Sequence, residues 1–231
     1  MVDARRMPKS RCRVVVLISG RGSNLQAIIG AMRSGELPIE LCAVISNSAQ
    51  ARGLANARAA GIESIAIDYR DFPDRASFDR ELSQRIDRYR PDLVVLAGFM
   101  RVLGGAFIDR YAGRLMNVHP SLLPAFPGLH THERALAAGA AEHGASVHFV
   151  TREVDGGPII VQARVPVGAG DTPRSLADRV LTEEHRIYPI AIRWYAEGRL
   201  TLSNGRVLLD GRPVPIKDAL PQPTAQENPK D

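Results

Sequence analysis

The chain has 231 residues, which suits one large domain with short extensions. Hydrophobic residues make up 45% and charged residues 24%, close to the averages of folded domains, and this excludes a mainly disordered or fibrous chain. The net charge of +5 is spread without a block of like charge, so it fits a small anionic substrate and we expect no nucleic-acid partner. No apolar run approaches the roughly 18 residues of a membrane span and no signal peptide is evident, so we expect a cytoplasmic protein.

The first half of the chain alternates strand and helix patterns. Residues 13–19 form an apolar run rich in β-branched side chains, which predicts a strand buried on both faces of a parallel sheet. A glycine turn and apolar residues at helical spacing follow, with Ser23 or Asn24 as the expected N-cap. The same patterns predict further strands at 41–46, 64–67, 93–98 and 115–119, and helices at 53–60, 78–89 and 106–111.

The second half predicts a different arrangement. Strands at 146–151 and 159–165 are joined by a connection too short for a parallel crossover of about a dozen residues, so they must be antiparallel. A long helix is expected over 172–197 with a kink at Pro189, followed by a hairpin that turns at residues 204–205. We therefore expect an α/β fold with a Rossmann-like open mixed sheet, parallel in its N-terminal half and antiparallel in its C-terminal strands, with helices on both faces. Ligands of such folds bind beyond the carboxyl ends of the strands.

A glycine-rich turn, Gly20-Arg21-Gly22-Ser23-Asn24, follows the first predicted strand. Its glycines let the backbone approach a ligand, and free N–H groups at a helix start favour an anion. The spacing matches neither the dinucleotide fingerprint nor the P-loop. A phosphate site and a simple tight turn before a helix both fit this segment.

Asn117 and His119 stand two residues apart at the end of a predicted strand, so their side chains share one face. An asparagine can donate to a developing oxyanion and a histidine can move a proton near neutral pH, although a structural pair before Pro120 also fits. Asp155 precedes two glycines, where it is either a turn former or a carboxylate that reaches a histidine and favours its charged form.

Five histidines fall between positions 119 and 148, which raises the question of a metal. Their spacing matches no zinc signature, and we expect no metal. The motifs of serine hydrolases, zinc proteases and thiol redox proteins are also missing from the sequence. Residues 120–128 hold three prolines, which would stiffen a loop beside His119.

Taken together, the motifs resemble the phosphoribosylglycinamide formyltransferase family from about Arg13 to about Leu209. Four ordered segments carry the resemblance: Val15 to Gln26, Leu96 to Leu103, Asn117 to Pro124, and Asp155 to Pro158. The resemblance implies a one-carbon transferase of de novo purine biosynthesis with 10-formyltetrahydrofolate as co-substrate. The substrate amine would attack the formyl carbon directly and form a tetrahedral intermediate.

The resemblance also implies roles for particular residues. Asn117 and His119 would stabilise the oxyanion, and Asp155 would keep His119 charged. The implied substrate contacts are Gly22, Ser23, Asn24 and Glu184, and the implied folate contacts are Arg75, Met100, Arg101, Val102, Leu103 and Asn117. The peptide before Pro124 is expected to be cis, and His130, His132 and His148 are expected to line the pocket or pack.

We expect an N-terminal extension (1–12), a single formyltransferase domain (13–212) and a flexible tail (213–231). Within the domain, residues 13–112 would bind the phosphorylated substrate and residues 113–212 would carry catalysis and folate binding. The alternatives are formyltetrahydrofolate hydrolase or another 10-formylfolate-dependent formyltransferase, whose expected extra domains of at least about 50 residues this chain lacks room for. A phosphate-binding module without catalysis would leave Asn117, His119 and Asp155 unexplained, and a homodimer stays open.

Overall fold

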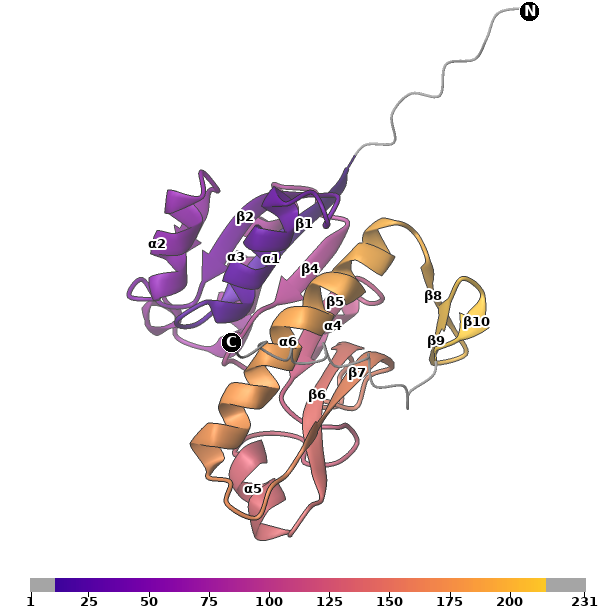
Figure 1. Ribbon diagram of the computed structural model, residues 1–231. Helices are drawn as coiled ribbons and strands as arrows, with labels where there is room; N and C mark the ends of the chain where they lie inside the picture. Colours follow the sequence, from indigo (N-terminus) through magenta and orange to yellow (C-terminus); the bar gives the residue numbers. More distant parts are fainter. Residues whose placement is uncertain (1–10, 215–231) are drawn as a thin grey trace, which may run out of the picture.

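The computed structural model describes residues 11–214 and contains a seven-stranded sheet and a small three-stranded sheet (Figure 1). The large sheet has the order β3-β2-β1-β4-β5-β6-β7; β1 to β5 are parallel, and β6 and β7 are antiparallel. This confirms the expected open mixed sheet. Its strands are β1 (Cys12–Ile18), β2 (Ile39–Ser46), β3 (Ser64–Ala66), β4 (Leu93–Leu96), β5 (Leu115–His119), β6 (Glu142–Phe149) and β7 (Ile159–Pro166).

Helices cover both faces of the sheet, as expected. One core packs against α1, α2 and α6, and the other against α3 and α4. The helices are α1 (Ser23–Arg33), α2 (Arg52–Ala59), α3 (Arg75–Asp87), α4 (Gly105–Arg110), α5 (Thr131–Ala137) and α6 (Pro173–Ala196), with a short 3-10 turn η1 (Tyr69–Asp71).

The two cores explain the continuous apolar run of β1. Val14, Val16 and Ile18 face one core, whereas Val15 and Leu17 face the other, because successive side chains of a strand point to opposite faces. All five are fully buried, and each contributes about 1.5–3 kcal/mol to folding by leaving water. A central strand covered on both faces therefore has no polar alternation in its sequence.

Helix α6 crosses the sheet (Figure 1), and Glu184 is one of its buried residues. It begins with a capping box in which the Thr172 side chain accepts from Ser175 N and the Ser175 side chain accepts from Thr172 N. The Tyr188 hydroxyl contacts the carbonyl oxygens of Leu96 and Met116 at 2.9 and 3.0 Å. These bonds tie the middle of the helix to β4 and β5.

Several sequence predictions need correction. Helix α1 begins after Gly22, which adopts a left-handed conformation, and no side chain caps it, so the expected capping by Ser23 or Asn24 is wrong. Strand β6 begins at Glu142 rather than 146, and neither α5 nor η1 was predicted. Both are short, so they carry too few apolar residues for a periodic pattern.

The C-terminal hairpin is confirmed, and it is extended by a third strand. Strands β8 (Leu200–Ser203) and β9 (Arg206–Leu209) flank a turn in which Asn204 and Gly205 have φ of 48° and 73°, and β10 (Arg212–Pro213) pairs with β9. The expected tail therefore begins inside a strand. Its remaining residues, 215–231, and residues 1–10 of the expected extension lie outside the described residues. Across residues 11–214, none of the helices has the length and apolar character to cross a membrane.

Candidate active site

The site lies where the order of the parallel strands reverses, at the carboxyl ends of β1, β4 and β5. Open α/β sheets bind ligands at such a switch point because neighbouring loops diverge there. Ser19, directly after β1, bonds to the loop that follows β4. Its backbone N–H donates to Gly98 O at 3.1 Å, and its hydroxyl accepts from Met100 N at 2.7 Å. The glycine-rich loop after β1 and the segment around Met100 after β4 are thereby held side by side.

The glycine-rich loop is closed tightly against α2. Gly22 has a φ of 75°, and a Cβ atom there would approach Gly53 Cα to 2.9 Å, so no larger residue fits without a shift. Gly53 N donates to Gly20 O at 3.0 Å and fixes this approach. Since no side chain caps α1, its first backbone N–H groups are available to an anion.

The structure brings Asn24 and Glu184 together although 160 positions separate them. Asn24 Nδ2 donates to Glu184 Oε2 at 2.6 Å, and both side chains are buried. This contact also explains the missing helix cap, because the Asn24 side chain is turned toward α6. Burial raises the pKa of Glu184 to about 7, opposed by the hydrogen bond from Asn24. The pKa of this carboxyl therefore lies near neutral pH.

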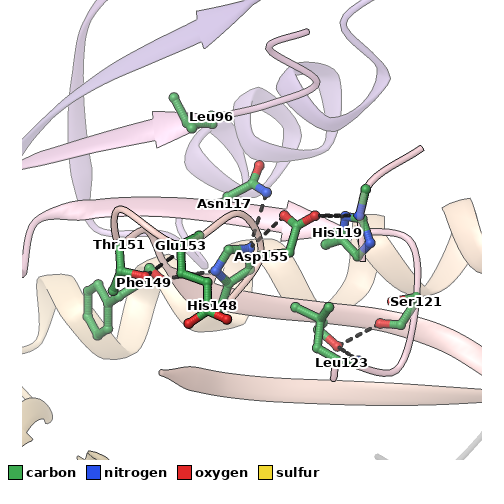
Figure 2. A network of polar contacts seen from close by, with 12 residues as sticks. Leu96, Asn117, His119, Ser121, Leu123, His148, Phe149, Thr151, Glu153 and Asp155 are labelled. Carbon is green, nitrogen blue, oxygen red and sulfur yellow. Dashed lines mark hydrogen bonds and ion pairs between the residues drawn. The ribbon is translucent and has the colours of Figure 1, made fainter. Parts of the chain in front are cut away.

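Asn117 and His119 project from the end of β5, as predicted, while Val118 between them packs in the core. Asp155 meets them from the loop between β6 and β7, and its Oδ2 lies 3.4 Å from His119 Nδ1 (Figure 2). Gly128 N donates to the same carboxylate oxygen at 2.8 Å. The structure thus places the three predicted catalytic residues in one cluster.

His119 is buried with an oxygen acceptor at each ring nitrogen. Nδ1 faces Asp155, and Nε2 lies 3.0 Å from the carbonyl oxygen of Phe126. A carbonyl and a carboxylate can only accept, so the ring satisfies both contacts when each nitrogen carries a proton. This geometry suits a cationic proton donor next to Asn117.

A buried polar network holds the proline loop that follows His119. The Ser146 hydroxyl donates to Ser121 O at 2.6 Å and accepts from Leu123 N at 3.0 Å and from Gln162 Nε2 at 2.8 Å. Gln162 Nε2 also donates to Leu123 O at 2.9 Å. The Leu123–Pro124 peptide is cis, as expected. The loop is therefore fixed from the neighbouring strands β6 and β7.

Replacing Ser146 by alanine is expected to destabilise the protein by about 1–3 kcal/mol, because its partners would stay buried without a bond. Urea unfolding followed by circular dichroism measures the change. Ser203→Ala, at an exposed position of β8, is the matched control and is expected to change stability by no more than about 0.5 kcal/mol. Equal stability of the two variants would show that the network does not hold the loop.

Four of the expected folate contacts, Met100 to Leu103, follow β4, which is the neighbour of β5 in the sheet. Met100 and Val102 are 73% and 63% exposed, unusually high for apolar side chains, whereas Leu103 is buried. Arg75 begins α3 and lines a groove of about 710 Å³ between α3 and α4. The Arg101 guanidinium lies 3.9 Å from the centroid of the Tyr69 ring. The contact between Tyr69 and Arg101 was not predicted, because sequence spacing gives no sign that η1 meets the loop after β4.

The remaining histidines differ in their surroundings. His130 is 75% exposed, so of its two expected roles, lining the pocket or packing, the second does not apply. His132 packs edge-on against His143, with ring centroids 5.2 Å apart, and burial lowers the pKa of His143 to about 4. His148, expected only to line the pocket or pack, contacts both Asn117 and Asp155. Its place in the register of β6 opposite Asn117 was the missing information.

Comparison with known proteins identifies the class. Residues 12–192 match the model of the formyl transferase family, and the chain belongs to this family. It is 55% identical to phosphoribosylglycinamide formyltransferase of Escherichia coli (strain K12) over 202 residues, which cover 87% of this chain and 95% of the relative. The family resemblance inferred from the motifs is thereby confirmed.

Two solved structures show the same fold. Phosphoribosylglycinamide formyltransferase from Coxiella burnetii is 53% identical and superposes with a TM-score of 0.86, covering 91% of this chain and 99% of that chain. A formyltetrahydrofolate deformylase from Pseudomonas syringae pv. tomato is 27% identical with a TM-score of 0.81, covering 87% of this chain and 66% of that chain. The fold is therefore shared by proteins that are named for transfer and for removal of a formyl group.

Proposed function

We propose that the protein transfers the formyl group of 10-formyltetrahydrofolate to the amine of phosphoribosylglycinamide in purine biosynthesis. The observation that carries the proposal is that Asn117, His119 and Asp155 lie together at the same sheet edge as the glycine-rich loop, whose helix start has no side-chain cap. The phosphoribosylglycinamide formyltransferase of Escherichia coli matches this chain over 95% of its own length, which supports the same acceptor.

The proposed reaction is a direct transfer. The amine nitrogen attacks the formyl carbon, and the carbonyl oxygen becomes an oxyanion. Asn117 would donate an N–H to this oxygen, and protonated His119 would donate from Nε2 in place of its contact with Phe126 O. The bond between the formyl carbon and the folate N10 then breaks, N10 gains a proton and the amine nitrogen loses one. Asp155 would favour the charged form of the imidazole from which this donation starts.

The phosphorylated substrate would bind across the sheet edge. Backbone N–H groups of Gly22, Ser23 and Asn24 would hold the phosphate at the start of α1, where the helix dipole also favours an anion. Glu184 would contact the glycinamide end, and its bond with Asn24 would link the two subsites. A substrate that bridges the loop and α6 would be fixed at both ends.

The folate would lie against Met100, Arg101, Val102 and Leu103, close to Asn117, with Arg75 near its glutamate tail. The exposed side chains of Met100 and Val102 support this placement, since an apolar surface beside a polar cluster is typical of a ligand site. Arg101 is held by the Tyr69 ring, which leaves its N–H groups free for a carboxylate. We propose no metal in the reaction.

Residues 13–212 are proposed to form one formyltransferase domain. Within it we propose that residues 13–112 bind the phosphorylated substrate and residues 113–212 carry catalysis and folate binding, with Arg75 and Met100 of the first half reaching the folate and Glu184 of the second half reaching the glycinamide. Sedimentation velocity tests the homodimer that the sequence leaves open.

A folate-absorbance assay tests the function. The purified protein is mixed with 10-formyltetrahydrofolate and then with phosphoribosylglycinamide, with buffer alone, or with charged initiator tRNA. We expect turnover only with the glycinamide. Loss of the formyl group in buffer alone would favour the hydrolase alternative, formylation of the tRNA would favour the other formyltransferase, and no reaction in any mixture would contradict the proposal.

A further inference from the structure

His148 lies on β6 directly across from Asn117 in the antiparallel pair of β5 and β6. Its side chain is 2% exposed, and its Nε2 lies 3.2 Å from Asn117 Nδ2 and 3.7 Å from Asp155 Oδ1. Figure 2 shows the same ring nitrogen in contact with the amide and with the carboxylate. The reaction proposed above gives this histidine no role.

The contacts of His148 select one form of its ring. Nδ1 lies 3.0 Å from the carbonyl oxygen of Phe149, which can only accept, so Nδ1 carries the proton. Nε2 then has a free lone pair, and it accepts an N–H from Asn117. Burial lowers the pKa of His148, which agrees with a neutral ring that keeps this arrangement.

The neutral ring in turn selects one orientation of the Asn117 amide. In the reverse orientation the amide oxygen would face the Nε2 lone pair, and two acceptors would repel each other. In the observed orientation one N–H of Asn117 is used by His148 and the second is left for a ligand, because the side chain is only half-buried. A donor, rather than an acceptor, is thereby presented to the formyl oxygen.

We propose that His148 is a positioning residue, whose unprotonated Nε2 fixes Asn117 as an oxyanion donor. The inference rests on the proposed formyl transfer and deepens it. Asp155 faces two imidazoles that have different partners. Its Oδ2 faces His119, whose two ring nitrogens each lie against an oxygen acceptor. Its Oδ1 faces His148, whose Nε2 accepts an N–H from Asn117. The two rings then act on the same oxygen, His119 directly and His148 through Asn117.

The first test compares His148→Leu with His148→Gln. Leucine removes the acceptor, and kcat is expected to fall about 10- to 100-fold, as for a misplaced catalytic group, while KM for the glycinamide changes little. Glutamine offers an amide oxygen in place of Nε2 and is expected to recover most of the loss. Failure of His148→Leu to lower kcat, or a loss that appears only in KM, would overturn the proposal.

A double-mutant cycle separates positioning from a general disturbance of β6. In an Asn117→Ala background, His148→Leu is expected to lower kcat by less than about threefold, because the residue it positions is absent. Val147→Ala, which weakens the same strand from the opposite face of the sheet, is the matched control and is expected to reduce kcat equally in both backgrounds. Independent, multiplying losses for His148→Leu and Asn117→Ala would contradict the inference.

A readout without substrate keeps this inference distinct from the proposed function. Nitrogen-15 NMR of the histidine rings is expected to show His148 neutral, with the proton on Nδ1, and Asn117→Ala is expected to shift its Nε2 resonance. A proton on Nε2 in the unaltered protein would sink the inference even if formyl transfer is found. If the unaltered protein transfers no formyl group, the proposed function fails whatever the NMR result.

Discussion

Replacing His119 by alanine is expected to lower kcat for formyl transfer by roughly 100- to 10,000-fold, the range for loss of a proton donor and an oxyanion contact. The variant removes the group that lies 3.4 Å from Asp155 and 3.0 Å from Phe126 O. The glycine-rich loop and Glu184, the proposed substrate contacts, are untouched, so we expect substrate binding to persist. Stopped-flow folate absorbance measures kcat, and isothermal titration of the glycinamide measures binding.

His130→Asn is the matched control for this experiment. His130 is exposed and takes a left-handed conformation that asparagine tolerates, so the variant removes an imidazole near the same loop without strain. We expect it to keep turnover within about twofold, as for most surface substitutions. If His119→Ala turns over like the unaltered protein, or if it fails to bind the glycinamide, the assigned role of His119 is wrong.

The sequence predicted the parts of the site that lie on strong local patterns. Asn117 and His119 follow a buried strand and differ by two positions, so their shared face was readable without a structure. The glycine-rich turn was equally visible, since Gly22 needs its left-handed conformation and its close approach to Gly53. For Asp155 the pattern left a turn former and a partner of histidine open, and the family resemblance favoured the second. For Glu184 only the resemblance pointed to a role.

The contacts that complete the site depend on distant pairing, which single-sequence patterns do not encode. Asn24 was expected to cap α1, but its amide bonds Glu184 across 160 positions, and a buried tertiary partner outweighs a local cap. His148 was expected only to line the pocket or pack, because nothing in the sequence shows that it stands opposite Asn117. Short elements such as α5 were missed for a different reason, their lack of a periodic stretch.

Replacing Glu184 by glutamine is expected to stabilise the protein at alkaline pH by up to about 3 kcal/mol. Burial raises the pKa of this carboxyl from 4.5 to about 7 in the folded protein. Below pH 4.5 both states hold the proton and the carboxyl imposes no penalty. Between pH 4.5 and 7 the unfolded chain releases the proton first, so stability falls as pH rises. Glutamine does not titrate, and its amide oxygen can still accept from Asn24.

Urea unfolding from pH 4 to pH 8 measures this difference between Glu184→Gln and the unaltered protein. Glu36→Gln, an exposed carboxyl, is the control and is expected to change stability by no more than about 0.5 kcal/mol. A constant difference across the pH range would contradict the raised pKa. The same variant is expected to transfer formyl groups more slowly, because it lacks the charge that would face the glycinamide in the proposed complex. A gain in stability at neutral pH together with slower transfer would indicate that the buried carboxyl serves substrate binding and not packing.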